Sequence, residues 1–270
     1  MIFETHAHFD DKAYDKDRET LLKSLEFHGI EGLVNVGADM KSSRRSIELA
    51  KEYPFIYAAV GVHPEQVEEL NEDALKELEE MAKEEKVVAI GEIGLDYYYD
   101  EVPKDIQKKW FIAQLELAVR QKKPVIIHSR DAASDTMEIM KEYHEKLTGI
   151  IHCFSYSKEC ADFFVKCGYY LGIGGVVTFS NAKKLKEVVK EVPMDRIVLE
   201  TDCPYLTPMP YRGKRNSSHY LPYVAEEIAK IREMPTQEVI RITNDNARRV
   251  YGIEKRVEKE VEKRKDGKTQ

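Results

Sequence analysis

Residues 87–96 read VVAIGEIGLD, a run of apolar residues and glycines that is interrupted only by Glu92 and Asp96 near its end. A nearly continuous apolar run of this kind is typical of a strand buried on both faces of a parallel sheet, and we expect this strand to cover residues 87–93. The segments on either side of it, 72–83 and 104–121, have the pattern of amphipathic helices, with apolar residues at spacings of three and four. This local order indicates a parallel sheet whose strands are joined by helices.

The same alternation continues along the chain. Further strands are expected at residues 2–6, 32–36, 56–62, 124–128, 149–153, 169–173 and 196–200, with helices at 15–27, 41–52, 132–146, 158–166, 182–190, 220–232 and from 235 to about 251. About eight strand–helix units over roughly 250 residues match one barrel. A doubly wound open sheet is the alternative, but no glycine-rich phosphate-binding motif follows a candidate strand. We predict an α/β fold, a single (β/α)8 TIM barrel over residues 1–253 with its active site at the C-terminal ends of the strands, followed by a charged extension at 254–270.

The composition excludes several classes of protein. The 270 residues include 42 Lys and Arg against 49 Asp and Glu, a net charge of −7, which argues against a protein that coats nucleic acid by bulk electrostatics. The longest apolar runs are too short to cross a bilayer, and the N-terminus lacks the regions of a signal peptide. The four cysteines match no zinc or redox motif. We expect a cytoplasmic protein with free thiols, no membrane association and no obligate protein partner.

Two histidines follow the first expected strand as a His-x-His sequence. Successive side chains of a strand point to opposite faces, so His6 and His8 share one face at the end of that strand. The other strands end in residues of the same chemical kind, namely Glu92, His128, His152 and, just beyond the last strand, Asp202. The active sites of barrels are built from such strand ends. The set therefore predicts a metal site, whereas any one of these residues alone would be explained by a hydrogen bond to a loop.

Four histidines and two carboxylates exceed the needs of one tetrahedral zinc ion. They suit two divalent ions, which together activate a water and neutralise charge on a phosphoryl or carbonyl oxygen. We expect Glu92 to bridge the two ions, because a glutamate can offer one oxygen to each. Asp202 is expected to bind one ion and to act as general base. The sequence contains no Ser–His–Asp grouping, so the nucleophile is expected to be metal-activated water.

Other residues suggest how a substrate is held. His63 follows the third expected strand and is predicted to contact a substrate oxygen. Arg212, Lys214 and Arg215 lie in a long loop after Asp202 and are interpreted as a phosphate clamp, with a solvated basic turn as the alternative. The tyrosines at 97–99 could stack on a base or simply pack within their loop.

Taken together, these segments closely resemble the TatD family of metal-dependent deoxyribonucleases, a branch of the amidohydrolase-like barrels. The resemblance lies in THAHFD at 5–10, GVHP at 61–64, GEIGLD at 91–96, IHSR at 127–130, IHCF at 151–154, ETDCPYL at 200–206 and RGKRN at 212–216. It implies the same six metal ligands, His6, His8, Glu92, His128, His152 and Asp202. It also implies DNA hydrolysis with magnesium or manganese, and we expect a 3′–5′ exonuclease on single-stranded or frayed ends, with a role in DNA repair. Histidine-rich ligation leaves zinc as a further option.

Two other functions remain open at this point. A related barrel hydrolase could cleave a cyclic amide, a lactone or an aminoacyl ester. Many such enzymes bridge their metals with a modified lysine at a strand end, a place that Glu92 takes in this chain. A non-catalytic scaffold could instead retain the metal for folding, but structural sites are normally closed and four-coordinate.

Overall fold

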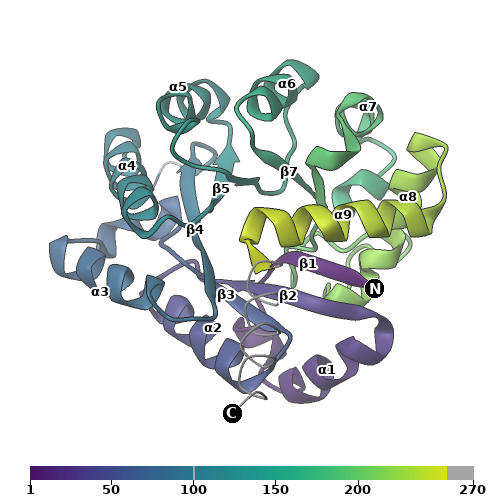
Figure 1. The fold of residues 1–270 in the computed structure, drawn as a ribbon, viewed down its shortest axis with the longest axis horizontal. Helices are drawn as coiled ribbons and strands as arrows, with labels where there is room; N and C mark the ends of the chain where they lie inside the picture. The colour runs from purple at the N-terminus through teal and green to yellow at the C-terminus, as the bar shows by residue number, and fades with distance from the viewer. Residues whose placement is uncertain (100, 254–270) are drawn as a thin grey trace, which may run out of the picture.

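Eight parallel strands follow one another in chain order around a barrel in the computed structural model, which describes residues 1–99 and 101–253 (Figure 1). The strands are β1 (Ile2–Ala7), β2 (Ile30–Val36), β3 (Ile56–Val60), β4 (Val87–Asp96), β5 (Val125–Arg130), β6 (Gly149–Ile151), β7 (Tyr170–Ile173) and β8 (Ile197–Leu199). Each strand pairs in parallel with the next one along the chain. The predicted TIM barrel is confirmed.

The barrel closes between its first strand and the segment that follows its last. The amide of Asp202 donates to the carbonyl of His6 (3.0 Å), and the amide of His8 donates to the carbonyl of Cys203 (2.9 Å). Ala7 and Cys203 form a parallel bridge between these two hydrogen bonds. Barrel closure therefore brings the chain at Asp202 beside the His-x-His segment.

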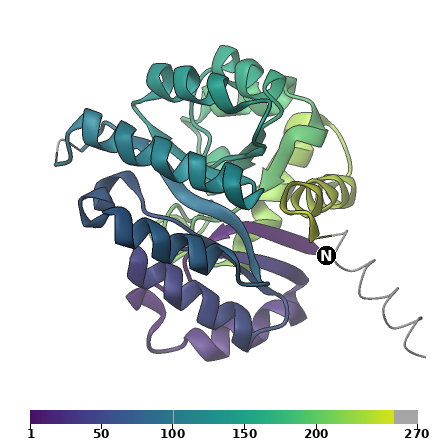
Figure 2. The same ribbon diagram turned by 60° about the vertical axis from the view of Figure 1, so that its left-hand side comes forward.

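Helices form an outer ring around the strands (Figure 1, Figure 2). They are α1 (Arg18–Leu25), α2 (Met40–Glu52), α3 (Glu72–Ala82), α4 (Lys104–Gln121), α5 (Ala133–Tyr143), α6 (Lys158–Lys166), α7 (Lys183–Glu191), α8 (Leu221–Arg232) and α9 (Thr236–Tyr251). Short 3₁₀ turns are η1 (Lys12–Tyr14), η2 (Glu26–His28), η3 (Pro64–Glu69), η4 (Gly175–Thr178), η5 (Met194–Arg196) and η6 (Ser218–Tyr220). None of the helices in the described residues combines the length and apolar character needed to cross a bilayer.

Helix α9 covers the end of the barrel at which the strands begin. The side chain of Asn244 donates to the carbonyl of Met1 (2.9 Å), and that of Asn246 donates to the carbonyl of Ile197, the first residue of β8 (2.8 Å). Tyr251 is buried and donates its hydroxyl to the carbonyl of Thr5. The opposite end, where the strands finish, stays available for a site.

Most expected elements occur within a few residues of their predicted bounds, and the differences have local causes. The first helix starts at Arg18 rather than at residue 15, because Asp11 accepts a hydrogen bond from the amide of Ala13 (2.7 Å) and holds the turn η1 in front of it. Strand β4 runs on to Asp96, beyond its predicted end at Ile93. The predicted extension at 254–270 lies outside the described residues.

Candidate metal centre

The two histidines at the end of the first strand, His6 in it and His8 just beyond it, approach each other through their ring nitrogens. The Nε2 atoms of His6 and His8 lie 3.0 Å apart. Nδ1 of His8 lies 2.8 Å from the carbonyl oxygen of Val36. A carbonyl can only accept, so this Nδ1 carries a proton and Nε2 of His8 is the ring nitrogen left to face the site. A hydrogen bond of this kind fixes both the tautomer and the orientation of a metal-binding imidazole.

The carboxylate of Glu92 lies between two groups of histidines. Its Oε2 is 3.4 Å from Nε2 of His6 and 3.7 Å from Nε2 of His8. Its Oε1 faces the other group, at 2.9 Å from Nδ1 of His128 and 3.3 Å from Nε2 of His152. Each oxygen of one carboxylate therefore faces a different pair of imidazoles, which is the geometry expected of a bridging ligand.

Asp202 completes the first group from the side of the pocket opening. Its Oδ1 is 3.4 Å from Nε2 of His8, 3.8 Å from Nε2 of His6 and 4.0 Å from Nε2 of His152. Its side chain is 17% exposed, against 5% for Glu92. Asp202 is therefore in contact with the histidines and is also accessible to solvent.

The spacing of these donor atoms fits metal ions. Ligand atoms bound at about 2.1 Å lie about 3.0–3.4 Å from one another at octahedral or tetrahedral angles. The His6–His8 distance of 3.0 Å and the His6–Glu92 distance of 3.4 Å fall in this range. Three sets of side chains bring ligand atoms within 4.8 Å of one another, namely His6, His152 and Asp202; His6, His8 and Glu92; and His63, Glu92 and His128. The structure thus gathers all six predicted ligands, and His63 joins them.

The ionisation of the site supports a cation-binding role. Burial alone would raise the pKa of Glu92, but the surrounding His152 and His6 outweigh it and hold that pKa well below its usual range. Asp202 has a lowered pKa because its hydrogen bond with His8 and the nearby imidazoles outweigh its burial. Despite burial, the same carboxylates raise the pKa of His8 to about 9, and Glu200 and Glu92 raise that of His152 to about 10. Ligation of these imidazoles is therefore coupled to proton release.

His63 stands at the edge of this group as a neutral ring. Its Nδ1 accepts a hydrogen bond from the amide of Glu65 (3.3 Å), so Nε2 carries the proton. That Nε2 lies 3.8 Å from Oε1 of Glu92, and the ring packs edge-on against His128. Burial and the nearby His128 lower the pKa of His63 to about 3. Its N–H is thus available as a neutral hydrogen-bond donor.

The predicted phosphate clamp lies outside the pocket that contains the histidines. That pocket has a volume of about 330 Å³, and its lining residues are His8, Asp10, Asp11, Ala38, Asp39, Ser42, His63, Glu92, His128, His152, Asp202 and Tyr205. Arg215 forms an ion pair with Asp17 (2.6 Å). The guanidinium of Arg212 lies over the ring of Phe179 (4.4 Å), and the ammonium of Lys214 lies over that of Tyr211 (5.6 Å).

Two buried carboxylates support the histidines from behind, and neither of them was assigned a role from the sequence. Oδ2 of Asp96 lies 2.9 Å from Nε2 of His128. Oε1 of Glu200 lies 3.3 Å from Nδ1 of His152 and accepts a hydrogen bond from the amide of Cys153 (2.5 Å). Asp96 ends β4 and Glu200 directly follows β8, so both occupy strand ends as the predicted ligands do.

Replacing Glu200 by glutamine is expected to weaken metal binding about 10–100-fold while the fold is retained. An amide cannot supply the negative charge that orients the His152 ring and raises its basicity, and such supporting contacts are worth about this much. Metal titration monitored by calorimetry measures the effect. Glu187→Gln, an exposed change on α7, serves as the control. Unchanged affinity in Glu200→Gln would show that His152 needs no such support.

Known proteins share both the sequence and the fold of this chain. The family model described as TatD related DNase matches residues 3–252. The chain belongs to the TatD family. The uncharacterized metal-dependent hydrolase YabD of Bacillus subtilis is 49% identical over 94% of this chain and 100% of its own. The uncharacterized metal-dependent hydrolase YcfH of Escherichia coli K12 is 35% identical over 94% of this chain and 97% of its own.

A solved structure agrees with this assignment to the TatD family. The crystal structure of YjjV, a TatD homologue from Escherichia coli K12, superposes with a TM-score of 0.88 at 30% identity, and covers 93% of this chain and 98% of its own. The relatives' names place the chain in a family of metal-dependent hydrolases. The predicted family resemblance is confirmed.

Proposed function

We propose that this TatD-family protein hydrolyses phosphodiester bonds of DNA with the help of two divalent metal ions. The observation that carries the proposal is the position of Glu92, whose two carboxylate oxygens face His6 and His8 on one side and His128 and His152 on the other. Nuclease sites commonly hold two metal ions about 3.5–4 Å apart, a separation that one bridging carboxylate can span. The description of the family as a DNase supports DNA as the substrate class.

The chain's own side chains then have distinct tasks. Bound divalent ions supply Lewis acidity, which lowers the pKa of a water and neutralises charge on the phosphoryl oxygens. Asp202 lies on the solvent side of the cluster and accepts the proton of the attacking water. His63, neutral and protonated at Nε2, donates a hydrogen bond to a phosphate oxygen. Glu92 keeps its charge throughout, because its pKa lies well below neutral pH.

The donor set bears on the choice among divalent metal ions. Imidazole nitrogens suit manganese and zinc, whereas magnesium prefers oxygen ligands and retains several waters. The site offers both kinds of donor, since Glu92 and Asp202 supply oxygen and four histidines supply nitrogen. Manganese or magnesium fits the proposed phosphodiesterase, with zinc as the other ion to be tested.

Exposed tyrosines beside the metal centre favour a substrate with accessible bases. Tyr98 and Tyr99, directly after β4, are 57% and 45% exposed, and Arg130 stacks on the Tyr98 ring at 3.7 Å. Tyr97 is held instead by a hydrogen bond from its hydroxyl to Asp135 (2.6 Å). Base stacking on such rings is tolerant of sequence and requires unpaired bases. These rings therefore favour single-stranded or frayed ends as the substrate, and we propose that the enzyme acts on such ends as a 3′–5′ exonuclease.

The loop at 212–215 is proposed to bind the phosphate backbone through the cations of Arg212 and Lys214, which form no ion pair among the described residues. The double variant Arg212→Ala/Lys214→Ala is expected to weaken DNA binding and to reduce its salt dependence, by about 0.7 in the log–log slope for each phosphate that is no longer neutralised. Fluorescence anisotropy over a salt series measures both quantities. Lys166→Ala, on the far end of α6, is the control. An unchanged slope would identify the loop as a solvated surface turn.

A panel of substrates tests the proposed function as a whole. The metal-loaded protein is given single-stranded DNA, duplex DNA, RNA, a phosphomonoester and a cyclic amide, and kcat/KM is measured for each. We expect single-stranded DNA to be the preferred substrate, with labelled 3′ ends removed first. Turnover of the cyclic amide in preference to every nucleic acid would instead support the amidohydrolase alternative.

The cellular setting is part of the same proposal. All four cysteines are free, which suits a reducing compartment. We place the reaction in the cytoplasm, where removal of nucleotides from frayed DNA ends would contribute to repair.

A further inference from the structure

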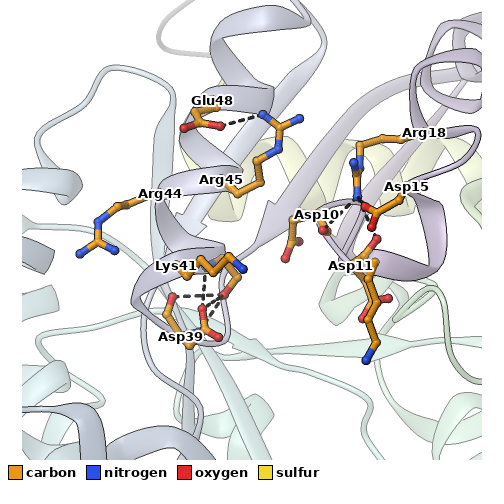
Figure 3. A pocket seen from close by; sticks show the side chains of 11 residues that line it. Asp10, Asp11, Asp15, Arg18, Asp39, Lys41, Arg44, Arg45 and Glu48 are labelled. Carbon is orange, nitrogen blue, oxygen red and sulfur yellow. Dashed lines mark hydrogen bonds and ion pairs between the residues drawn. The ribbon is translucent and has the colours of Figure 1, made fainter.

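A second pocket lies directly beside the metal pocket and is larger, with a volume of about 570 Å³. Its walls come from two parts of the chain, the segment at 10–18 after β1 and the first half of α2 (Figure 3). It shares the lining residues Asp10, Asp11, Asp39 and Ser42 with the metal pocket. The two pockets therefore form one continuous depression that leads away from the metal centre.

The three arginines that line this second pocket already form ion pairs. Arg18 pairs with Asp15 (2.7 Å), and Arg45 pairs with Glu48 (2.7 Å), as Figure 3 shows. Arg44 pairs with Glu77 outside the pocket. These arginines are thus partly neutralised, and none of them is a strong candidate for capture of a ligand.

The carboxylates on the floor of the pocket also have partners. Oδ1 of Asp11 accepts from the amide of Ala13, and Oδ1 of Asp39 accepts from the amide of Ser42 (2.6 Å). Asp10 accepts from the side-chain amide of Asn35 (2.8 Å). These acids keep phosphates away from the floor, but their remaining oxygens can accept hydrogen bonds from base N–H groups.

Two lysines that line this pocket differ from its arginines because they form no ion pair among the described residues. Lys12 and Lys41 are exposed and make no ion pair within residues 1–99 and 101–253. They come from opposite walls, Lys12 from η1 and Lys41 from the first turn of α2. Figure 3 shows the Lys41 side chain extending across the pocket toward the wall that carries Asp10 and Asp11.

We propose that Lys12 and Lys41 bind backbone phosphates of a single nucleic-acid strand that runs on from the metal pocket into the second pocket. The strand lies with its phosphates on the two lysines at the rim and its bases toward the acidic floor. A free ammonium group binds a phosphate as a point charge and releases a counterion. This inference rests on the proposed function and adds the path of the substrate, which sequence alone did not suggest.

A substrate path of this kind separates long substrates from short ones. A dinucleotide can occupy the metal pocket without reaching both lysines. A long strand fills both pockets and binds to both lysines. Removal of the two ammonium groups should therefore affect long strands only, whereas damage to the metal centre would affect every substrate.

The test compares Lys12→Ala/Lys41→Ala with the wild-type protein and with the control Lys141→Ala/Lys166→Ala, which removes the same charge from the far ends of α5 and α6. Anisotropy of a labelled single-stranded oligonucleotide, with calcium in place of the working metal, measures binding. Hydrolysis of a dinucleotide measures the metal centre. We expect oligonucleotide binding to weaken about tenfold, with a salt slope shallower by about 1.4 because two phosphates are no longer neutralised, and dinucleotide hydrolysis to stay unchanged.

A variant that keeps the positive charges shows whether binding depends on the charge of the two side chains or on their shape. Lys12→Arg/Lys41→Arg should bind the oligonucleotide as the wild type does. Binding and salt slope that match the wild type in the alanine variant would overturn the inference. A wild-type protein that binds the strand through these lysines but cleaves no nucleic acid would overturn the proposed function and leave the path in place.

Discussion

Glu92→Gln is expected to lower the bound metal from two ions per chain to one at most and to reduce kcat/KM on DNA about thousandfold or more. Glutamine has nearly the same shape, but its amide offers one weak oxygen donor and one N–H group where the wild type offers two anionic oxygens. The two histidine pairs would then lose their shared ligand. Two-metal catalysis is worth several kcal/mol at the transition state, and each 1.4 kcal/mol is about tenfold in rate.

Metal content after dialysis, together with steady-state kinetics, measures this effect. Glu138→Gln, an exposed change on α5, controls for the loss of one negative charge. Circular dichroism verifies that the variant is folded. A Glu92→Gln protein that retains two tightly bound ions and near-normal turnover would remove Glu92 from its bridging position.

Asp202→Asn is expected to retain the fold and at least one metal ion but to lower kcat about 10²–10⁴-fold. Asparagine keeps an oxygen that can face His8, yet it cannot accept the proton of the attacking water. Because Asp202 acts on the chemical step, KM for DNA should change much less than kcat. Single-turnover kinetics with the metal-loaded variant measure the step directly.

The matched control for this variant is Asp195→Asn, an exposed aspartate in η5 close to the start of β8. It removes one negative charge near the same strand without touching the site. Near-normal DNA cleavage by Asp202→Asn would assign the role of base to another group.

The barrel could be predicted because the amino-acid sequence of its strands shows that they are buried on both faces. Apolar runs such as 87–91 and 124–127 have no polar face, which only a strand covered on both sides tolerates. Strands β6 and β8 are shorter than predicted, at three residues each, so His152 lies just beyond the regular sheet, as Asp202 was predicted to do. The ligand set did not depend on these bounds, because the strand ends still converge.

The role of Asp96 as a partner of His128 was harder to predict than the ligands, because it depends on how closely β4 and β5 approach each other. Gly94 has a φ of 147°, and a Cβ atom there would lie 1.9 Å from the carbonyl oxygen of His128. Only glycine allows β4 to run this close to β5, and the close approach brings Asp96 to His128. No periodicity in the sequence indicates such an approach.

The proposed path of the substrate strand could not be predicted from the sequence for a related reason. Arg212, Lys214 and Arg215 are conspicuous because they are adjacent in sequence, whereas Lys12 and Lys41 meet at one pocket only after β1 and β2 have paired. Cations that are close together in the sequence are easily recognised, but the sequence does not show which distant lysines come together in the folded protein. The structure also shows that Arg215 is bound to Asp17, which the composition of its loop did not indicate.

Anomalous diffraction from crystals grown with Mn²⁺ shows whether Glu92 lies between two metal ions. We expect two peaks on opposite sides of the Glu92 carboxylate, one within bonding distance of His6 and His8 and the other within bonding distance of His128 and His152. A single peak, or two peaks that do not share Glu92, would rule out the bridging role of Glu92.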